Sequence, residues 1–253
     1  PIFKADANAR SVYVIDLLYD TIKKSLKIEP RLQPVTGALA DDATVAKVVK
    51  EWVAKGFDGF RANGFRPEEV VAIPNEPLDG LEGSVRSHFT VLTDIIAQAL
   101  LREAPDADLS VFNSGTIRID DVIQPGPVTQ YDVIRVMPFG NKVVEVEMSG
   151  DVLKRVLDQG RANKGIGGYL LYANVDFNPE TRAWAVNGVA VDPGRTYKVA
   201  TLDFLMSGRE SGLGFLKYDT PGVRLIAEKR DMRFPVIEEL KARFPARLSS
   251  RTQ

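Results

Sequence analysis

Three short segments of the sequence combine small polar residues, arginines, aromatic rings and a carboxylate in ways that are not typical of a protein core. The first is Asn113–Arg118 (NSGTIR), which directly follows the apolar stretch Leu109–Phe112. Small polar residues and a glycine after a strand, followed by an arginine, bring backbone N–H groups and a guanidinium to one crevice, as recognition of an anion or a hydroxyl group requires. A turn with a solvated arginine explains the same residues equally well.

The second segment is Met137–Asn141 (MPFGN). Pro138 and Gly140 favour a tight, non-helical backbone around Phe139. An aromatic side chain on such a turn is often exposed, and Asn141 beside it can recognise an amide or the edge of a ring. The alternative is a phenylalanine buried under the turn as a plug, which is the commoner arrangement for an isolated case.

The third segment is Asp203–Glu210 (DFLMSGRE), in which Phe204 is expected at the end of a strand. Glu210 follows six residues later, and carboxylates are well suited to bind the neighbouring hydroxyls of a ribose. Phe139 and Phe204 together could sandwich a base, and each stacked base contributes about 1–3 kcal/mol. The residues alone fit a core role for both rings as well.

Other catalytic arrangements are disfavoured by what the sequence lacks. There is no cysteine and a single histidine, His88, which argues against cysteine-ligated metals, thiolate nucleophiles and a complete di-metal phosphatase centre. An all-carboxylate magnesium site stays open, although no compact Asp/Glu cluster supports one. The sequence contains no GxxxxGK[ST], GxGxxG or GxSxG motif. On the residues alone, Gly165–Gly168 and Gly212–Gly214 are predicted to be plain turns.

The composition is that of an ordinary water-soluble globular protein. The chain has 253 residues, 44% of them hydrophobic and 26% charged, with a net charge of −1. This balance does not point to a nucleic-acid polymer or an anionic membrane as a partner. No apolar run is long enough for a transmembrane helix, and the first residues do not form a signal peptide.

The first third of the chain predicts a hairpin and one long helix. Ser11–Asp20 and Leu26–Glu29 are expected to pair as a β-hairpin, followed by a linker over Arg31–Ala40. Asp42 is expected to cap a helix that runs to about Asn63, with an apolar stripe at helical spacing. This stripe comprises Val45, Val48, Val49, Trp52 and Val53. A short strand over Glu69–Ile73 and a loop over Pro74–Gly83 complete this part.

The remainder mixes helices and strands, so the predicted fold class is α+β with layered mixed sheets. Helices are expected to start at Thr90, at Ser149 and around Pro235. The dipeptide Asn187-Gly188 predicts a hairpin turn. The expected strands are Leu109–Phe112, Lys142–Met148, Tyr169–Phe177, Ala183–Val186 and Tyr197–Phe204, and in the second of these Val144, Val146 and Met148 share one face.

Four motifs together resemble the C-terminal domain of the 5'-nucleotidase family, which includes UDP-sugar hydrolases and 2',3'-cyclic phosphodiesterases. NSGTIR at Asn113–Arg118 fits the family pattern N-[GS]-G-x-[IF]-R, and Pro138–Asn141 fits its P-F-G-[NG] turn. Gly167–Tyr172 fits a G-x-[YF] strand, and Asp203–Glu210 fits in part an [ND]-F-L-x-x-G-G-D-G segment. The resemblance covers roughly Gly83 to Tyr218, and the order and spacing of all four motifs agree.

The resemblance implies a role for eight residues in binding a nucleoside or nucleotide. In this family two phenylalanines sandwich the base, an asparagine contacts the base, a glycine lines its pocket, and arginines lie toward the ribose and the rest of the substrate. A carboxylate binds the ribose hydroxyls. The matching substrate-binding positions here are Arg86, Asn113, Arg118, Phe139, Asn141, Gly167, Phe204 and Glu210.

Two features depart from the family pattern. The family's GGDG is replaced here by Gly208–Ser211 (GRES), so that Glu210 stands where an aspartate binds the ribose and Arg209 is an additional cation. An arginine expected a few residues before Arg86 is missing, and Glu82 lies near that position. The resemblance therefore leaves base and ribose specificity open.

The resemblance also implies a second domain that this sequence does not contain. In the family, a calcineurin-like metallophosphatase domain precedes the C-terminal domain and carries a divalent metal pair, but its Asp-x-His, Gly-Asn-His-Glu and Gly-His-x-His motifs do not occur here. We therefore expect residues 1–41 to be the closing strands of that domain, 42–80 a linker helix and loop, and 81–253 the nucleotide-binding domain. The chain is expected to need no cofactor of its own and to be inactive alone. Its expected partner is its own N-terminal catalytic domain, and its expected location is the periplasm or the cell exterior. A stand-alone nucleotide-binding module is the alternative.

Overall fold

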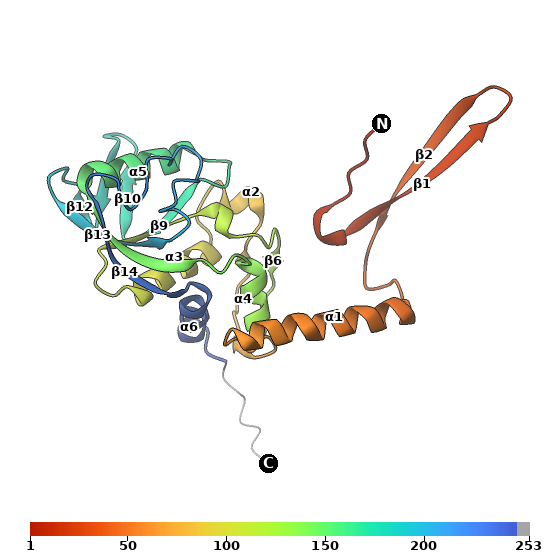
Figure 1. Ribbon diagram of the computed structural model, residues 1–253, viewed down its shortest axis with the longest axis horizontal. Coiled ribbons are helices and arrows are strands. Elements are labelled where there is room, and N and C mark those ends of the chain that lie inside the picture. The colour runs from red at the N-terminus through yellow and green to blue at the C-terminus, as the bar shows by residue number, and fades with distance from the viewer. Residues whose placement is uncertain (247–253) are drawn as a thin grey trace, which may run out of the picture. The chain divides into compact units, whose positions relative to one another are not determined.

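The computed structural model describes residues 1–246. The chain divides into two compact units, one that ends at Gly59 and one that begins at Phe60 (Figure 1). Among residues 1–246, no helix has both the length and the apolar character needed to cross a membrane.

The first unit is built on the predicted hairpin, which is confirmed. A short 3-10 turn, η1 (Ala7–Ala9), precedes β1 (Ser11–Asp20), which pairs antiparallel with β2 (Ser25–Pro34) along its whole length. The predicted linker over Arg31–Ala40 was wrong in its first four residues, because the pairing continues to Pro34 opposite Ser11. Prolines are tolerated there because each strand of a two-stranded ribbon has one side without a hydrogen-bonded neighbour.

The predicted long helix is confirmed as α1 (Ala43–Ala62), which spans the division between the two units. The Asp42 carboxylate caps it by accepting hydrogen bonds from the Thr44 and Val45 N–H groups, both at 2.9 Å. All five residues of its predicted apolar stripe are exposed.

A five-stranded sheet forms the centre of the second unit. One neighbouring pair, β13 and β5, runs parallel, and the other pairs run antiparallel. Helices and mixed strands together make this an α+β fold, as predicted. In spatial order the strands are β14 (Val223–Asp231), β8 (Lys142–Ser149), β13 (Thr196–Leu202), β5 (Leu109–Asn113) and β9 (Leu170–Ala173).

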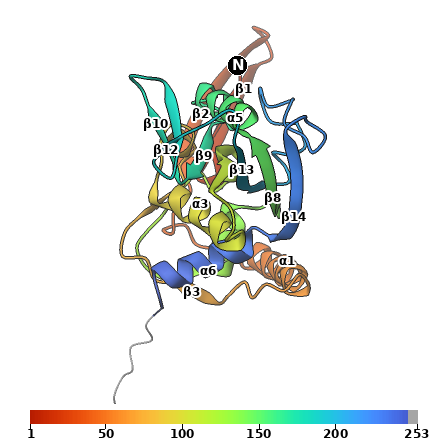
Figure 2. The same ribbon diagram turned by 90° about the vertical axis from the view of Figure 1, so that its left-hand side faces the viewer.

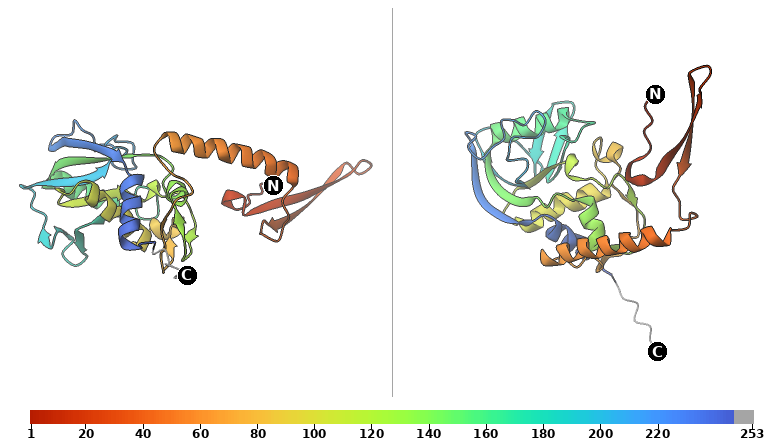
Figure 3. Two further views of the ribbon diagram at one scale, coloured as in Figure 1. Left: turned by 90° about the horizontal axis from the view of Figure 1, so that it is seen from below. Right: turned by 45° about the vertical axis from the view of Figure 1, so that its right-hand side comes forward.

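Each face of this sheet carries its own hydrophobic cluster. On one face lie α3 (Val91–Glu103) and α6 (Arg233–Arg243), and on the other lies α5 (Gly150–Ala162) (Figures 1 and 2). The right-hand view of Figure 3 shows the same layers. Along β8, Val144, Val146 and Met148 belong to the cluster under α5, which confirms their predicted common face. The sheet is thus covered on both sides, and its strand ends are the places where side chains can reach a ligand.

Small elements complete the second unit. The predicted hairpin at Asn187-Gly188 is confirmed and belongs to a three-stranded sheet that packs beside α5. The three-stranded sheet consists of β10 (Val175–Asn178), β11 (Ala183–Val186) and β12 (Val189–Ala190). The other small elements of the second unit are β3 (Val70–Ala72), β4 (Leu78–Asp79), α2 (Glu82–Val85), η2 (Ser114–Thr116), β6 (Val122–Ile123), β7 (Val128–Thr129) and α4 (Gln130–Val136).

The predicted helix starts reflect capping side chains. Thr90 caps α3 with a reciprocal capping box to Thr93, and the Ser149 hydroxyl caps α5. The last helix, by contrast, begins at Arg233, two residues before the predicted Pro235. Proline is tolerated anywhere in the first turn of a helix, because no N–H there has an intrahelical partner.

Several strand and loop predictions need correction. The predicted strand Tyr169–Phe177 is interrupted at Asn174, whose left-handed φ of 63° turns the chain between β9 and β10. The strand predicted to reach Phe204 ends at Leu202. The predicted loop Pro74–Gly83 contains β4 and the start of α2, because Leu78 is fully buried and anchors it to the core. The sequence analysis did not identify β14 or α4.

Candidate functional site

The topology of the central sheet brings four separate segments to one edge, which is the edge where β5 and β13 end and where β8 and β9 begin. The strands β5 and β13 are parallel, so the segments that follow them, 113–118 and 203–210, leave at the same edge. The strands β8 and β9 run opposite to these two, so the segments that precede them, 137–141 and 165–169, arrive at that edge. The four motifs of the sequence analysis therefore converge because of strand direction, although up to about 100 residues separate them in sequence.

Backbone hydrogen bonds join two of these segments directly. The Ser114 N–H donates to the Tyr169 carbonyl and the Gly115 N–H donates to the Gly167 carbonyl, each at 2.8 Å. A Cβ on Gly115 would lie 3.1 Å from the Gly167 carbonyl oxygen. This close approach of two backbones explains why glycine is found at Gly115.

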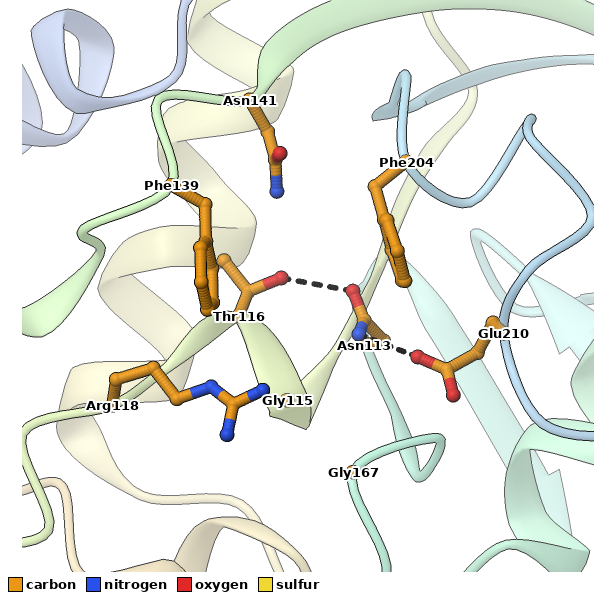
Figure 4. A pocket seen from close by; sticks show the side chains of 9 residues that line it. All are labelled: Asn113, Gly115, Thr116, Arg118, Phe139, Asn141, Gly167, Phe204 and Glu210. Atoms are coloured by element: carbon orange, nitrogen blue, oxygen red, sulfur yellow. Dashed lines mark hydrogen bonds between the residues drawn. The ribbon is translucent and has the colours of Figure 1, made fainter.

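A cavity of about 420 Å³ lies where the segments meet. Phe139 and Phe204 face each other across it, with Asn141 near one end of the gap between them (Figure 4). Arg118, Gly167 and Glu210 lie toward the other end. The lining residues are Asn113, Gly115, Thr116, Arg118, Phe139, Asn141, Gly167, Phe204 and Glu210.

Phe139 stands out from its turn. Its side chain is 57% exposed, so the alternative of a phenylalanine buried as a plug is wrong. Gly140 has a φ of 63°, a conformation that favours glycine and turns the chain between Phe139 and Asn141. The Asn141 carbonyl accepts a hydrogen bond from the Met232 N–H at 2.9 Å, which ties the turn to the end of β14.

Phe204 lies two residues beyond the end of β13 and is half-buried. Its carbonyl accepts a hydrogen bond from the Ser207 hydroxyl at 2.6 Å. The guanidinium carbon of Arg209 lies 5.8 Å from the centroid of the Phe204 ring, and the Arg209 Nε donates to the Ser207 hydroxyl at 3.2 Å. Arg209 thus packs close to one wall of the cavity, although it does not line it.

A chain of hydrogen bonds holds the Glu210 carboxylate. Its Oε2 accepts from the Asn113 Nδ2 at 2.6 Å, and its Oε1 accepts from the Ser211 N–H at 2.7 Å. The Asn113 Oδ1 accepts in turn from the Thr116 hydroxyl at 2.8 Å. Figure 4 shows this chain from Thr116 through Asn113 to Glu210.

The loop that carries Glu210 is also fixed from α5. The Asn163 Nδ2 donates to the Ser211 carbonyl at 2.7 Å and to the Gly168 carbonyl at 3.1 Å. The Asn163 Oδ1 accepts from the Gln159 Nε2 at 2.9 Å. One buried amide therefore connects two of the segments that form the site.

The structure brings together seven of the eight predicted site residues, and Arg86 is the one that does not line the cavity. Its guanidinium forms an ion pair with Glu82 at 2.7 Å, and its carbonyl accepts from the Gly165 N–H at 2.7 Å. Sequence analysis missed Gly115 and Thr116 as lining residues. Both lie inside the Asn113–Arg118 motif, so the signal was present in the sequence.

The lining offers contacts for a flat ring, for hydroxyl groups and for an anion. The two aromatic faces suit a planar ring system, Asn141 suits its polar edge, Glu210 accepts hydrogen bonds, and Arg118 donates them. Among residues 1–246, no group of three or more His, Cys, Asp or Glu side chains is arranged to hold a metal ion.

The sequence and the fold are both similar to those of known 5'-nucleotidases. Protein UshA of Yersinia enterocolitica is 34% identical over 151 residues, which cover 58% of this chain and 26% of that protein. A 5'-nucleotidase of Vibrio parahaemolyticus is 32% identical over 222 residues, which cover 84% of this chain and 37% of that protein. The crystal structure of the 5'-nucleotidase precursor from Thermus thermophilus matches with a TM-score of 0.73 at 20% identity, over 93% of this chain and 47% of that one.

The chain spans less than half the length of each of these relatives. The family model described as "5'-nucleotidase, C-terminal domain" matches residues 71–217, which is more than half of the chain and includes all four motifs. The chain therefore belongs to the family of 5'-nucleotidase C-terminal domains.

Proposed function

We propose that this chain binds a nucleoside or nucleotide in the cavity between Phe139 and Phe204, as the substrate-recognition part of a 5'-nucleotidase-type phosphohydrolase. The observation that carries the proposal is the pair of aromatic rings that face each other across the cavity (Figure 4). Two such faces stabilise a base by stacking on both of its sides, at about 1–3 kcal/mol for each stacking contact.

The polar residues around the rings suit the remaining parts of a nucleotide. Asn141 lies where it can hydrogen-bond the edge of a base held between the rings. Glu210, at the opposite end of the cavity, would accept hydrogen bonds from the ribose hydroxyls. Arg118, at the same end, would contact the ribose and the anionic part of the substrate.

We propose further that hydrolysis belongs to a longer protein in which a metallophosphatase domain precedes this chain. Membership of the 5'-nucleotidase family supports a phosphohydrolase as the parent enzyme. A divalent metal pair in that domain would activate water and stabilise the displacement at phosphorus. The contribution of this chain is to bind and orient the substrate, which converts a bimolecular reaction into one between fixed groups. The family resemblance also supports a periplasmic or extracellular location.

The proposal is tested by calorimetry and thermal unfolding of the 253-residue chain with adenosine, AMP, UDP-glucose and 2',3'-cyclic AMP. A ligand present at about 100 times its Kd adds about 2.7 kcal/mol to the stability of the folded state. We expect saturable binding of at least one of these compounds with an increase in Tm. The proposal of a nucleotide site is wrong if none of them binds.

A second assay tests the proposal that this chain binds the substrate but does not hydrolyse it. The purified chain is incubated with AMP and divalent metal ions, and phosphate release is measured. We expect none, because the described residues carry no suitable metal site. Metal-dependent release of phosphate by the chain alone would contradict the proposal that hydrolysis requires a preceding metallophosphatase domain.

A further inference from the structure

Two buried side chains of the cavity lining, Thr116 and Asn113, form hydrogen bonds that connect them to Glu210. Thr116 is 2% exposed and Asn113 is 3% exposed. The Thr116 hydroxyl donates to the Asn113 Oδ1 at 2.8 Å, and the Asn113 Nδ2 donates to the Glu210 Oε2 at 2.6 Å (Figure 4). The three side chains, all of which belong to residues that line the cavity, thus form one continuous chain of hydrogen bonds.

The order of donors and acceptors in this chain fixes the orientation of the Asn113 amide. An ionised carboxylate only accepts hydrogen bonds, so the amide must present its NH₂ group to Glu210. The amide oxygen then faces Thr116 and requires a donor there. A hydroxyl is the smallest side-chain group that supplies one, and a hydroxyl is what Thr116 provides.

The chain also restricts Glu210 itself. A glutamate side chain has three rotatable bonds and loses considerable conformational freedom when it is held in one place. Here the Asn113 amide holds one carboxylate oxygen, and the Ser211 N–H holds the other. Each carboxylate oxygen can accept more than one hydrogen bond, so a carboxylate fixed in this way still has lone pairs for a ligand.

We infer that Thr116 is a positioning residue, whose hydroxyl locks the Asn113 amide so that Glu210 is held in place to receive the two neighbouring hydroxyls of a ribose. This inference rests on the proposed nucleoside site. It assigns to Thr116 the preference of the site for ribose over 2'-deoxyribose, although Thr116 itself need not touch the sugar.

The physical consequence of losing the hydroxyl follows from burial. Without it, the Asn113 Oδ1 is a buried acceptor without a partner, which is unfavourable. A rotation of the amide by 180° would not solve this, because it would place the oxygen against the Glu210 carboxylate and the two would repel each other. Either arrangement weakens the hold on Glu210, and the carboxylate samples orientations that do not match a ribose.

The experiment compares Thr116→Val with Thr116→Ser in the full 253-residue chain. Valine keeps the shape of threonine without the hydroxyl, and serine keeps the hydroxyl. Calorimetry gives the Kd of adenosine and uridine and of their 2'-deoxy forms. We expect the unaltered chain to bind the ribonucleosides about tenfold more tightly than the deoxy forms, the difference that one charge-assisted hydrogen bond makes.

In Thr116→Val we expect this ratio to fall to about two or less, because the loss of affinity falls mainly on the ribonucleosides. Thr116→Ser should restore most of the ratio. Glu210→Gln serves as the reference, since it should remove the ratio directly. If Thr116→Val does not fold, Thr116→Ala replaces it, because alanine removes the hydroxyl without adding bulk.

A measurement without ligand tests the same inference. The side-chain NH₂ protons of Asn113 should exchange slowly with solvent in ¹⁵N NMR spectra of the unaltered chain and of Thr116→Ser, and faster in Thr116→Val. The inference is overturned if Thr116→Val leaves both the affinity ratio and the exchange rate unchanged while Glu210→Gln abolishes the ratio. The proposed function stands in that case. If the unaltered chain binds no nucleoside, the proposed function fails, and with it the part of the inference that concerns ribose.

Discussion

The guanidinium carbon of Arg118 lies 5.1 Å from the centroid of the Phe139 ring, at one wall of the candidate site. A cation beside an aromatic face is attracted by the ring and limits the positions that an exposed ring can take. Arg118 makes no ion pair with a carboxylate among residues 1–246. Its guanidinium can therefore orient Phe139 and still bind an anion.

This pairing predicts a charge-dependent loss of affinity in Arg118→Gln. We expect AMP to bind about tenfold more weakly, because one charge-assisted hydrogen bond contributes about 1.5–3 kcal/mol and part of it is screened by solvent. The affinity for adenosine, which is uncharged, should fall less than the affinity for AMP. Calorimetry at low and high salt checks the result, and Arg118→Lys is the control that keeps the charge but not the planar fork. Equal losses for AMP and adenosine would mean that Arg118 acts on Phe139 alone.

The aromatic pair predicts that binding and stability respond separately to truncation. Phe139→Ala should weaken nucleoside binding by about 1–3 kcal/mol. Its effect on Tm should be small, because the ring is 57% exposed. Phe204→Ala should weaken binding equally and lower Tm more, since this ring is half-buried.

Phe65→Ala is the control for this pair. Phe65 is 2% exposed and stacks on Phe234 with the ring centroids 4.4 Å apart, away from the residues that line the cavity. Truncation of such a core ring costs about 3–5 kcal/mol of stability. A similar pattern for Phe139→Ala, with a large drop in Tm and unchanged affinity, would show that Phe139 is a structural residue.

Sequence patterns predicted most of the residues that line the cavity, but they did not predict the strand pairing that brings these residues together. The motif Asn113–Arg118 and the aromatic at 204 each showed unusual chemistry, and the family resemblance linked them. These two segments follow strand ends at the same side of the sheet because β5 pairs in parallel with β13. This pairing joins residues about 90 positions apart and leaves no local signal in the sequence. Arg86 was expected to bind substrate, but it does not line the cavity, and its guanidinium forms an ion pair with Glu82. A local motif could not show which of its possible partners the guanidinium contacts.

β14, one of the strands that sequence analysis missed, illustrates the limit of hydrophobic patterns. β14 (VRLIAEKRD) lies at the edge of the sheet, is largely exposed, and its last four residues are all charged. Edge strands are commonly rich in charged side chains, which prevent pairing with other molecules. Its register also shifts twice along β8, so no clean alternation of apolar residues appears.

Tyr172 predicts a loss of stability at alkaline pH. Burial, the first cause, together with Tyr169 and Asp176 nearby, raises the pKa of Tyr172 from 10.0 to about 12, although Arg161 opposes the shift. The unfolded chain would ionise this phenol near pH 10, whereas the folded protein resists ionisation up to about pH 12. Its contribution is therefore complete below pH 10 and is lost as the pH rises toward 12.

The matching variant is Tyr172→Phe, compared with the unaltered chain by denaturant unfolding at pH 7 and between pH 10 and 11. We expect the unaltered chain to lose at most about 1.4 kcal/mol more than the variant by pH 11, and less where solvent reaches the phenol. Values at pH 7 give the effect of the substitution itself. The assignment to Tyr172 is wrong if both proteins lose the same stability.

The last prediction concerns Gly140, whose position between Phe139 and Asn141 makes the turn sensitive to a single methyl group. Its φ of 63° is unfavourable for any residue with a Cβ, by about 1–2 kcal/mol. A Cβ there would also lie 2.7 Å from the Arg233 Nη2. Arg233 cannot easily move away, because it forms a 2.5 Å ion pair with Asp231 and its side chain is only 11% exposed.

Gly140→Ala should therefore shift the turn and move Phe139 and Asn141 away from the facing Phe204. We expect a lower Tm together with a loss of nucleoside affinity of about tenfold, on the scale of one stacking contact. Gly188→Ala is the matched control, since Gly188 has a φ of 75° but no atom within 4 Å of the position that a Cβ would take, and it lies in the hairpin between β11 and β12. It should lower Tm through backbone strain and leave affinity unchanged. If Gly140→Ala behaves like this control, the tight turn stabilises the fold without positioning the aromatic wall of the site.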